Sequence, residues 1–585
     1  MAEKIVVIGG GIGGLSVAHH LVRAGVDGVH MYEASDRVGG KAKSQYVDVG
    51  AAAPYPGEHG FRFFPHFYRH IVDTMATTPA GGGTVLDRLV GASDAGVAFD
   101  RDLSTIARTS EPLEAFRFVT SVVRVLQDRK IQLDDVVRYA GVLLRFATSC
   151  QERRDQEYDR QPWTEFAHAD SFSDSFDALV IKASRNLSAM RAAESSAATI
   201  GSISLQMIFD FEPKIGRLMD PLLRGPTDET WLEPWLRHLE AAGVTFHFEK
   251  PLTAFDFDDA AGRLRSVRFG AETVAADHYV CAVPLECVVP LLSAEMCAFD
   301  PSLARLASLA PRARGDMIGL QFFLRRDVPI VRGHVHYPRT PFALTSVSQA
   351  QFWSPKPDAR PGTPELKGVI SAIISDWQSA GSEGLKASEY TDRNRLLEEV
   401  WRQIEGSLPV GAVDRGDVIA MHLDQNVRLG PFANDTPLLV HPVGQLALRP
   451  DAATRIANLY LASDYVRTHT DLATMEGADE AARRAAGAIL AREGVPAERR
   501  PFVKPLTEGP VFEAAKRLDA ALFEAGLPHA MAAGERVHDH AVEIEGRAID
   551  ALQRVVTALP LHPRIDWRRP DPAVFEHWGR VLTRP

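Results

Sequence analysis

The sequence predicts an α/β protein organised around a Rossmann-like dinucleotide-binding domain at its N-terminus. Ile5 to Ile8 is a short β-branched apolar run, which is typical of a buried strand in a parallel sheet. Gly9, Gly11 and Gly14 follow in the spacing G-x-G-x-x-G, and Leu15 to Ala24 then has the composition of a helix. A strand, a glycine turn and a helix in this order predict a site for the phosphates of a dinucleotide.

Each part of this unit has a physical role. The first glycine allows the tight turn, the second lets a pyrophosphate approach the backbone, and the third lets helix and strand pack closely. The helix N-terminus offers N–H groups and the positive end of its dipole to the phosphates. A second predicted strand begins at Val29 and ends in Glu33, 19 residues beyond Gly14, where a carboxylate would hold a ribose diol. This context favours a dinucleotide site over a glycine-rich turn of another kind.

The overall composition limits the classes of function. A chain of 585 residues is too long for one hydrophobic core, so we expect two or three structural units. The net charge of −11 argues against a nucleic-acid partner and gives no attraction to anionic lipid. The four cysteines lack C-x-x-C spacing, which favours a reducing cytoplasm. Glycines interrupt the first apolar run and no run approaches 18 apolar residues, so neither a signal peptide nor a membrane span is expected.

The residues after Glu33 indicate which dinucleotide binds. The segment reads Glu33-Ala34-Ser-Asp-Arg37-Val-Gly39-Gly40-Lys41. It resembles the extension E-x-x-x-R-x-G-G-R of the amine oxidase and carotenoid (phytoene) desaturase superfamily of FAD enzymes. The resemblance implies FAD rather than NAD, with Arg37 near the pyrophosphate and the two glycines close to the flavin. Lys41 replaces the usual second Arg, a departure also found in phytoene desaturases of the plant and cyanobacterial type.

A second informative segment runs from Gly57 to Pro65 and combines glycines, a histidine, an arginine and three aromatic residues. By resemblance, it lies beside the isoalloxazine ring. We expect its aromatic residues to wall a pocket for an apolar substrate: Phe61, Phe63 and Phe64. His59 and Arg62 are the candidate catalytic residues, placed near the polar edge of the flavin. The alternative interpretation is a set of core aromatics with a surface arginine.

The far end of the chain carries the matching motif. Asn458 to Asp464 is a predicted strand that ends in a carboxylate, and a helix is predicted to open at Met475. The superfamily reads A-G-D and then M-E-G-A here, which implies that Asp464 holds the ribityl or pyrophosphate region. The helix N-terminus would face flavin N1 and O2, where negative charge accumulates on reduction. With Leu252 placed by resemblance at the adenine, the predicted cofactor-binding residues are Gly9, Gly11, Ile12, Gly13, Gly14, Glu33, Ala34, Arg37, Gly39, Gly40, Lys41, Gly60, Phe61, Arg62, Leu252, Asp464, Thr474 and Met475.

The regions between the motifs predict additional units. Residues 85–240 are mostly helical in pattern, with amphipathic stretches over 113–126 and 136–147. They are interpreted as a helical cap, and monotopic membrane contact is the second interpretation. The predicted FAD-binding domain has three parts, over residues 1–80, 236–290 and 431–495. The other predicted units are a helical cap over 81–235, a mixed α+β substrate domain over 291–430 and a C-terminal helical extension over 496–585.

The extension carries predicted helices over 511–523 and 536–558, which shorter family members lack. Docking on the main body, a homo-oligomer contact and a lid all remain open for them. Two histidine pairs, His66 with His70 at i, i+4 on a predicted helix and His334 with His336 on one face of a predicted strand, are interpreted as ordinary structural histidines because no carboxylate pattern accompanies them. No metal site is predicted.

Two departures from the amine oxidases bear on the chemistry. By resemblance, Gly319 stands where those enzymes typically keep a Lys beside flavin N5, and Thr474 stands where they often have Tyr. The resemblance therefore implies hydride transfer to flavin N5 from an allylic or activated C–H of an apolar isoprenoid- or polyene-like substrate. The electron acceptor would be O2 or a quinone. Amine oxidation, redox-neutral isomerisation or dehydroxylation, and a non-catalytic electron-relay subunit remain alternatives.

Overall fold

The computed structural model describes residues 4–108, 121, 124–209, 218–506 and 510–534. A parallel five-stranded sheet forms the nucleotide domain, and its order is β23-β13-β1-β2-β9. The strands are β1 (Ile5–Ile8), β2 (Val29–Tyr32), β9 (Thr245–His247), β13 (His278–Cys281) and β23 (Leu459–Leu461). This sheet joins three distant parts of the chain, and the predicted Rossmann-like α/β fold is confirmed.

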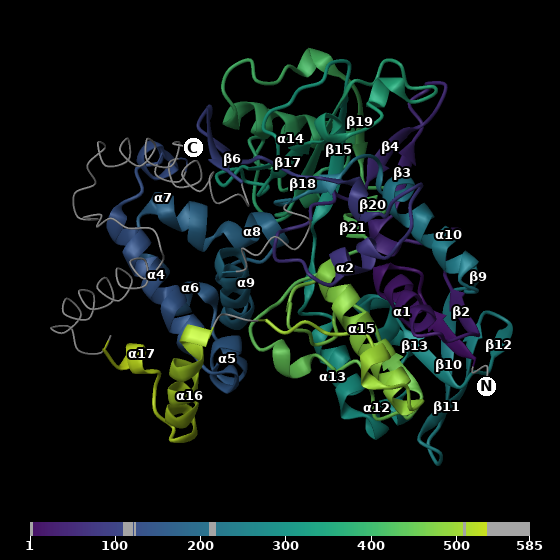
Figure 1. Ribbon diagram of the computed structural model, residues 1–585. Helices are drawn as coiled ribbons and strands as arrows, with labels where there is room; N and C mark the ends of the chain where they lie inside the picture. The colour runs from purple at the N-terminus through teal and green to yellow at the C-terminus, as the bar shows by residue number, and fades with distance from the viewer. Residues whose placement is uncertain (1–3, 109–120, 122–123, 210–217, 507–509, 535–585) are drawn as a thin grey trace, which may run out of the picture.

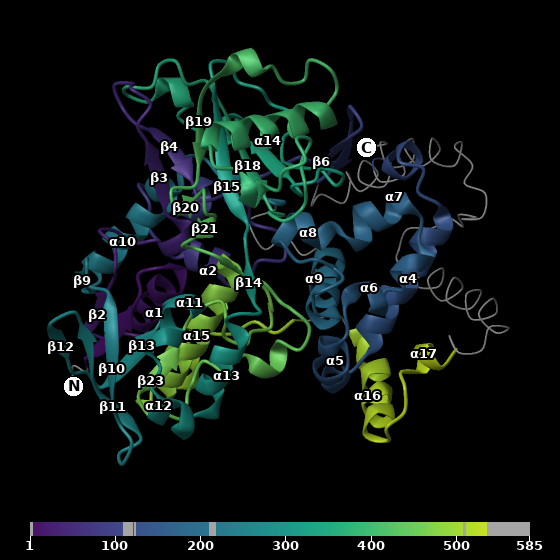
Figure 2. The same ribbon diagram turned by 180° about the vertical axis from the view of Figure 1, so that it is seen from behind.

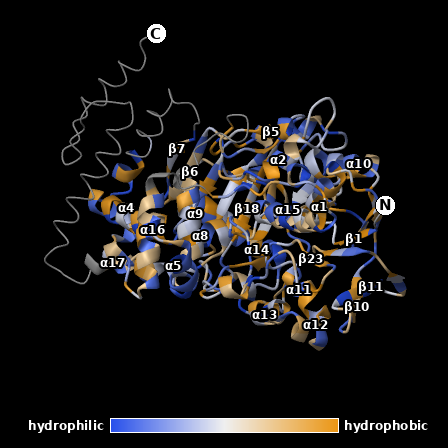
Figure 3. Ribbon diagram, turned by 60° about the horizontal axis from the view of Figure 1, so that its bottom comes forward, coloured by the Kyte–Doolittle hydropathy of each residue, from blue (hydrophilic) through white to orange (hydrophobic). Residues whose placement is uncertain are grey.

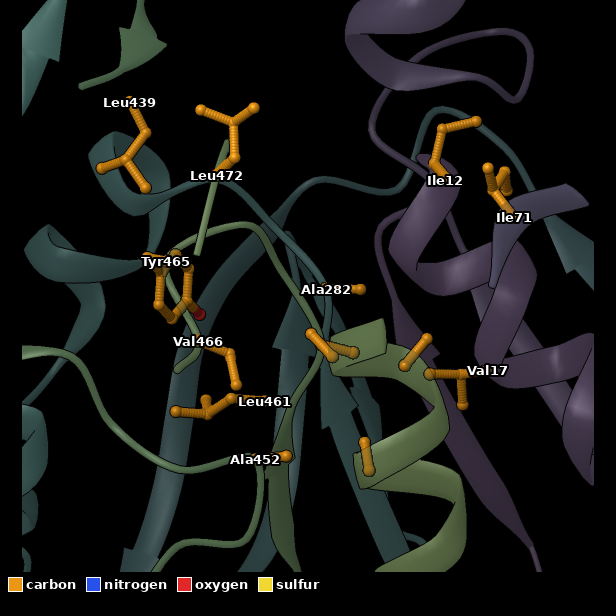
Figure 4. Packing of buried hydrophobic residues seen from close by; sticks show 14 of the residues in the cluster. Ile12, Val17, Ile71, Ala282, Leu439, Ala452, Leu461, Tyr465, Val466 and Leu472 are labelled. Atoms are coloured by element: carbon orange, nitrogen blue, oxygen red, sulfur yellow. The ribbon is translucent and has the colours of Figure 1, made fainter. Parts of the chain in front are cut away.

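Two helices converge on the carboxyl ends of the central strands. They are α1 (Ile12–Arg23) and α15 (Met475–Arg492), which pack against each other. Ile12 and Val17 of α1 belong to the same buried core as Ala282 and Leu461, and Figure 4 shows part of this core. A Cβ atom on Gly13 would lie 2.0 Å from the carbonyl oxygen of Ala462, so this close approach requires glycine. An antiparallel meander flanks the domain and consists of β10 (Leu252–Asp258), β11 (Arg263–Phe269) and β12 (Glu272–Val274).

Buried carboxylates of α15 hold the neighbouring elements. Glu476 accepts hydrogen bonds from the backbone N–H groups of Arg69, His70 and Ile71, at the start of α2 (Ile71–Ala76). Asp479 accepts hydrogen bonds from Ser16 of α1 and Thr74 of α2, and it forms an ion pair with Arg483. Glu480 accepts hydrogen bonds from the backbone N–H groups of residues 469 and 470. These charges are buried but hydrogen-bonded, which is the condition for tolerating them in a core.

The second domain is built on a seven-stranded sheet of order β19-β15-β18-β17-β16-β6-β7. Its strands are β6 (Asp94–Phe99), β7 (Asp102–Ala107), β15 (Ile318–Leu324), β16 (His334–His336), β17 (Thr345–Ser348), β18 (Gly368–Ile374) and β19 (Val418–Leu423). Leu320 and Phe322 face Val400 and Trp401 of α14 (Arg393–Ser407), which covers one face of the sheet. The opposite face turns toward the nucleotide domain.

A helical region lies beside both sheets (Figure 2). It contains α4 (Leu133–Thr148), α5 (Gln151–Gln156) and α9 (Ala197–Phe209). Helix α16 (Pro510–Glu524) of the C-terminal extension contacts α4 and α5. Asp519 of α16 pairs with Arg153 at 3.0 Å and accepts the N–H of Cys150 at 2.8 Å. Docking on the main body therefore holds for α16, while the predicted helix over 536–558 lies outside the described residues.

Two local predictions need correction. Residues 89–107, expected within a mostly helical region, form β5 (Leu89–Val90), β6 and β7. Strand β6 pairs in parallel with β16, a partner more than 200 residues away that local pattern cannot reveal. His66 and His70 do not share a helix, because α2 begins at Ile71.

Two further predictions concern the helical cap. The predicted helix over 113–126 falls mostly on residues outside the described ranges, whereas the one over 136–147 is confirmed as α4. Hydrophobic and hydrophilic residues are interspersed along α4 in Figure 3. Across the described ranges, no helix is both long and apolar enough to cross a bilayer.

Candidate active site

A cavity of about 1070 Å³ is lined by residues of both the nucleotide domain and the seven-stranded sheet. Among the described residues, its lining includes every predicted site residue except Gly14 and Arg37. The predicted residues brought together here are Gly9, Gly11, Ile12, Gly13, Glu33, Ala34, Gly39, Gly40, Lys41, His59, Gly60, Phe61, Arg62, Leu252, Asp464, Thr474 and Met475. Segments separated by more than 400 residues therefore form one site.

The nucleotide end of the cavity is shaped by the backbone. The carboxylate of Glu33 accepts the Gly10 N–H at 2.7 Å, and it also accepts the backbone and hydroxyl hydrogens of Ser35 at 2.9 and 2.7 Å. Helix α1 starts directly after Gly11 without an acidic residue in its first turn. Its first N–H groups are thus available to an anion. An oriented carboxylate beside a glycine-lined helix N-terminus fits the ribose and pyrophosphate of FAD.

Gly14 and Arg37 have structural contacts in this arrangement. A Cβ atom on Gly14 would lie 1.9 Å from the carbonyl oxygen of Gly9, so this glycine allows α1 to pack on the turn. The Arg37 guanidinium pairs with Asp228 at 3.1 Å and donates to the carbonyl of Ser44 at 3.0 Å. Arg37 thereby links the loop after β2 to neighbouring segments, and its predicted contact with the pyrophosphate stays a prediction.

His59 is held by a buried carboxylate that the sequence had not indicated. The Nδ1–H of His59 donates to Asp424, which also accepts the side chain of Gln45 at 2.8 Å and the N–H of Asn426 at 2.8 Å. Burial has the largest single effect and would raise the pKa of Asp424, but the hydrogen bond and charge of His59 together with the bonds from Gln45 and Asn426 outweigh it and lower the pKa to about 2. Asp424 is therefore ionised, and Nε2 is the His59 nitrogen left for a reacting group. Asp424 directly follows the largely apolar stretch Val418–Leu423, which forms β19, and a carboxylate at the end of such a stretch is the sequence signal that could have suggested it.

Arg62 and Lys41 form the adjoining part of the lining. The Arg62 guanidinium donates to the carbonyl oxygen of Lys41 at 3.1 Å, and Lys41 pairs with Glu286 at 2.9 Å. Burial lowers the pKa of Arg62, while nearby Glu58 opposes that shift. The same burial raises the pKa of Glu58 to about 7. Arg62 therefore brings positive charge to the part of the cavity where the resemblance places the flavin's polar edge.

Gly319 is packed against the chain that carries His59. Its N–H donates to the carbonyl oxygen of His59 at 2.9 Å, and a Cβ atom on it would lie 2.2 Å from that oxygen. The backbone of His59 and Gly60 thus fills the space into which a side chain at position 319 would extend. This contact explains in physical terms why the residue is glycine.

The remaining lining combines apolar walls with a few polar residues. Phe61 and Phe63 line the cavity as expected, and each ring centroid lies 5.3 Å from that of His334. Phe64 does not wall the pocket: it is buried in the core beside Tyr68 and Trp231. Further apolar lining comes from separate elements: Leu179, Leu187, Ile203, Met207, Met317 and Ile373.

His334 and His336, interpreted from the sequence as ordinary structural histidines, line the cavity. Burial lowers the pKa of His334 to about 3 and that of His336 to about 4, so both rings are neutral at pH 7. His66 and Asp220 also line this region, where Arg108 pairs with Asp220. In the described ranges, no group of three or more His, Cys, Asp or Glu side chains is arranged to hold a metal ion.

Comparison with known proteins agrees with this geometry. Residues 12–490 match the profile of a family described as flavin containing amine oxidoreductase. The chain belongs to this family. The match begins inside the first nucleotide motif and covers the second, and the residues at the cavity fit FAD, so the protein is a flavin-dependent oxidoreductase.

The relatives of known name have different activities. The chain is 24% identical to 15-cis-phytoene desaturase of Synechococcus elongatus over 529 residues, which are 86% of this chain and 99% of that protein. It is 26% identical to hydroxysqualene dehydroxylase of Rhodopseudomonas palustris over 507 residues, or 84% and 99% of the two chains. Cyclohexylamine oxidase from Brevibacterium oxydans shares the fold, with a TM-score of 0.54, 16% identity, and coverage of 84% of this chain and 100% of the other.

Proposed function

We propose that this family member is a desaturase-like enzyme that removes hydride from an allylic or otherwise activated C–H of an apolar, isoprenoid- or polyene-like chain. The main support is the contact of Gly319 with the backbone of His59 and Gly60. This contact leaves no room for the side chain that amine oxidases typically place there. Two relatives aligned over 99% of their own length are named 15-cis-phytoene desaturase and hydroxysqualene dehydroxylase, which supports a substrate of this class.

The residues of the cavity have separable roles in this reaction. When bound, FAD supplies the acceptor for the hydride. Phe61, Phe63 and Ile373 would hold the apolar chain and exclude water from it. His59 would accept the proton from the carbon next to the one that loses hydride, so that a C=C bond forms between them. Asp424 orients the ring and stabilises its positive charge, as carboxylates do for catalytic histidines.

A dehydroxylation on the same class of chain is the second candidate. Its support is the similarity to hydroxysqualene dehydroxylase, which covers 99% of that protein. Net desaturation requires an external electron acceptor, for which we propose molecular oxygen or a quinone. Dehydroxylation replaces C–OH by C–H with release of water, which is a two-electron reduction and requires reduced flavin as the electron donor. The two candidates therefore differ in whether, without oxygen, the substrate bleaches the oxidised flavin or restores the colour of the reduced flavin.

Anaerobic reduction of the purified flavoprotein tests the proposal. Mixing with phytoene or squalene in detergent should bleach the flavin absorbance, whereas benzylamine and putrescine should leave it unchanged. Asp424→Asn should slow bleaching about 10²-fold or more, because loss of the carboxylate removes both orientation and charge stabilisation from His59. Gln45→Leu is the matched control: it removes a neighbour of Asp424 but keeps the carboxylate, so a smaller effect is expected. Bleaching by the amines alone would contradict the proposal.

A further inference from the structure

We infer that the substrate carries a neutral oxygen group, a hydroxyl or a carbonyl, at a distance from its reacting carbon, and that His336 and Thr345 bind this group. The inference deepens the proposed function and rests on it, because it takes the cavity face of the seven-stranded sheet as the substrate site. Two buried polar atoms on this face have no hydrogen-bond partner within the part of the chain that the structure describes.

His336 and Thr345 occupy facing positions on adjacent strands. They are register partners in the antiparallel pair β16–β17, so their side chains project from the same face of the sheet. Both residues line the cavity. The Nε2 atom of His336 and the Oγ1 atom of Thr345 are buried, and neither has a hydrogen-bond partner among the described residues. Buried polar side-chain atoms in native proteins are nearly always paired. Two unpaired atoms side by side in one cavity indicate that a ligand completes them.

The chemistry of this pair selects a neutral ligand. Burial holds the His336 ring in its neutral form, so it presents one donor and one acceptor. Thr345 adds a hydroxyl that can donate or accept. Arg108 and Asp220, a charged pair that lines this region, compensate each other, and burial alone accounts for the pKa shift of His336. A carboxylate or an ammonium group would therefore meet no counter-charge here, whereas a hydroxyl or carbonyl can satisfy both atoms.

The register also places the subsite relative to the flavin edge. One row of paired residues crosses the sheet from Gly319 to Ile373, Thr345, His336 and Val97. Gly319 contacts the backbone of His59, beside which the chemistry is proposed. Neighbouring strands are about 4.8 Å apart, so Thr345 lies roughly 10 Å and His336 roughly 14 Å along this row. The oxygen group is thus an anchor that positions the chain, and the bond that reacts lies elsewhere on it.

Binding of two chains that differ in one oxygen tests the inference. The FAD-loaded protein is titrated with farnesol and with farnesene, and binding is followed by the perturbation of flavin absorbance. Farnesol should bind about two- to tenfold more tightly, as expected for one or two neutral hydrogen bonds. Equal affinity, or no binding of farnesol, would overturn the inference. Because the readout is binding, it is independent of flavin bleaching by polyenes, on which the proposed function depends.

Substitutions locate the effect. Thr345→Val removes the hydroxyl at nearly constant shape, so the ratio of the affinities for farnesol and farnesene should fall toward one. Thr345→Ser keeps the hydroxyl and should keep this ratio. His336→Phe should also reduce the ratio. Farnesol selectivity that persists in both Thr345→Val and His336→Phe would overturn the inference.

Thermal stability gives a second readout without any ligand. Removing an unpaired buried hydroxyl should leave the Tm of Thr345→Val unchanged or raise it. Thr340→Val is the matched control, because the Thr340 hydroxyl donates to Tyr337 at 2.8 Å and accepts the Leu344 N–H at 2.9 Å. It should lower the Tm and leave farnesol selectivity as in the parent. A Tm loss in Thr345→Val as large as in Thr340→Val would show that the hydroxyl is paired within the protein, against the inference.

Discussion

The two ends of the cavity are built on different principles. At the nucleotide end, the carboxylates are hydrogen-bonded within the protein: Glu33 accepts from the Gly10 N–H and from Ser35, and Glu476 accepts from the backbone at the start of α2. At the sheet end, His336 Nε2 and Thr345 Oγ1 have no partner in the described part of the chain. The nucleotide end is therefore preformed, and we refer to it as the cradle: it consists of the turn Gly9 to Gly14, the Glu33 segment and the turn before Met475. The sheet end leaves hydrogen-bonding capacity for a ligand.

This difference teaches where specificity resides in the molecule. The cradle depends on backbone atoms and on glycines that allow close approach, so it can serve one cofactor whatever the substrate is. The sheet end depends on single side chains, such as His336 of β16 and Thr345 of β17. A substitution in the cradle should therefore affect folding or FAD retention, whereas one on the sheet face should affect the choice of substrate.

The largest effect is expected at Gly13. An added Cβ would lie 2.0 Å from the Ala462 carbonyl oxygen, so Gly13→Ala forces α1 away from the strand end. We expect a loss of more than about 3 kcal/mol of unfolding free energy, measured by urea denaturation. Gly11→Ala is the matched control, because its nearest neighbour would be Gly40 Cα at 3.9 Å. Gly11→Ala should fold but retain less FAD. Equal stability of the two variants would contradict the steric requirement for glycine at position 13.

The second largest loss of stability is expected at Gly319, which lies between the two ends of the cavity. Gly319→Ala places a methyl group 2.2 Å from the His59 carbonyl oxygen and should cost about 2–4 kcal/mol of stability, because backbone must move. Gly60→Ala, whose Cβ would make an ordinary 3.5 Å contact with Ile373, is the control and should cost less than about 1 kcal/mol. Urea midpoints measure both. A fully stable Gly319→Ala would remove the steric argument against a Lys at this position.

Acid should destabilise the protein through its buried neutral histidines. Burial lowers the pKa of His334 and His441 to about 3, so the folded chain stays unprotonated there while the unfolded chain protonates near pH 6.5. The unfolded state then binds more protons, and stability falls as pH drops from 6.5 toward 3. Each such histidine contributes on the order of 2 kcal/mol by pH 5.

Urea midpoints at pH 7 and pH 5 measure this dependence. His334→Phe should make the loss of stability between the two pH values smaller. The variant lacks one histidine that binds a proton in the unfolded chain but not in the folded chain. An identical loss in parent and variant would contradict the assignment of His334 as a buried neutral ring.

The same contrast explains what the sequence could predict. The cradle was predictable because its determinants are contiguous: Gly9 to Gly14, the Glu33 segment and the turn before Met475 are each read from a few adjacent residues. Their geometry follows from local rules for glycine turns and helix N-termini. The structure accordingly brings these segments together around one cavity.

The sheet end was not predictable by the same reasoning. Alternation along β16 shows that His334 and His336 share a face, but it does not show which strand lies beside them. That neighbour is β6, more than 200 residues earlier, in a region that looked helical. Asp424 was missed for the same reason, since 365 residues separate it from His59. Non-local pairing decides these contacts, and a single sequence does not reveal it.

The smallest effect considered is at Glu33, and it concerns FAD retention rather than folding. Glu33→Gln keeps the shape but removes the charge that accepts the Gly10 and Ser35 hydrogens, so FAD binding should weaken by about 1–3 kcal/mol. Dialysis followed by flavin absorbance measures the loss. Ser35→Ala removes a hydroxyl that bonds to Glu33, the Arg37 carbonyl oxygen and Lys43, but it keeps the Glu33 charge, so it should weaken binding by less than Glu33→Gln. Farnesol selectivity of the remaining holoenzyme should be as in the parent, because the anchor lies at the other end of the cavity. Altered selectivity would show that the two ends are coupled.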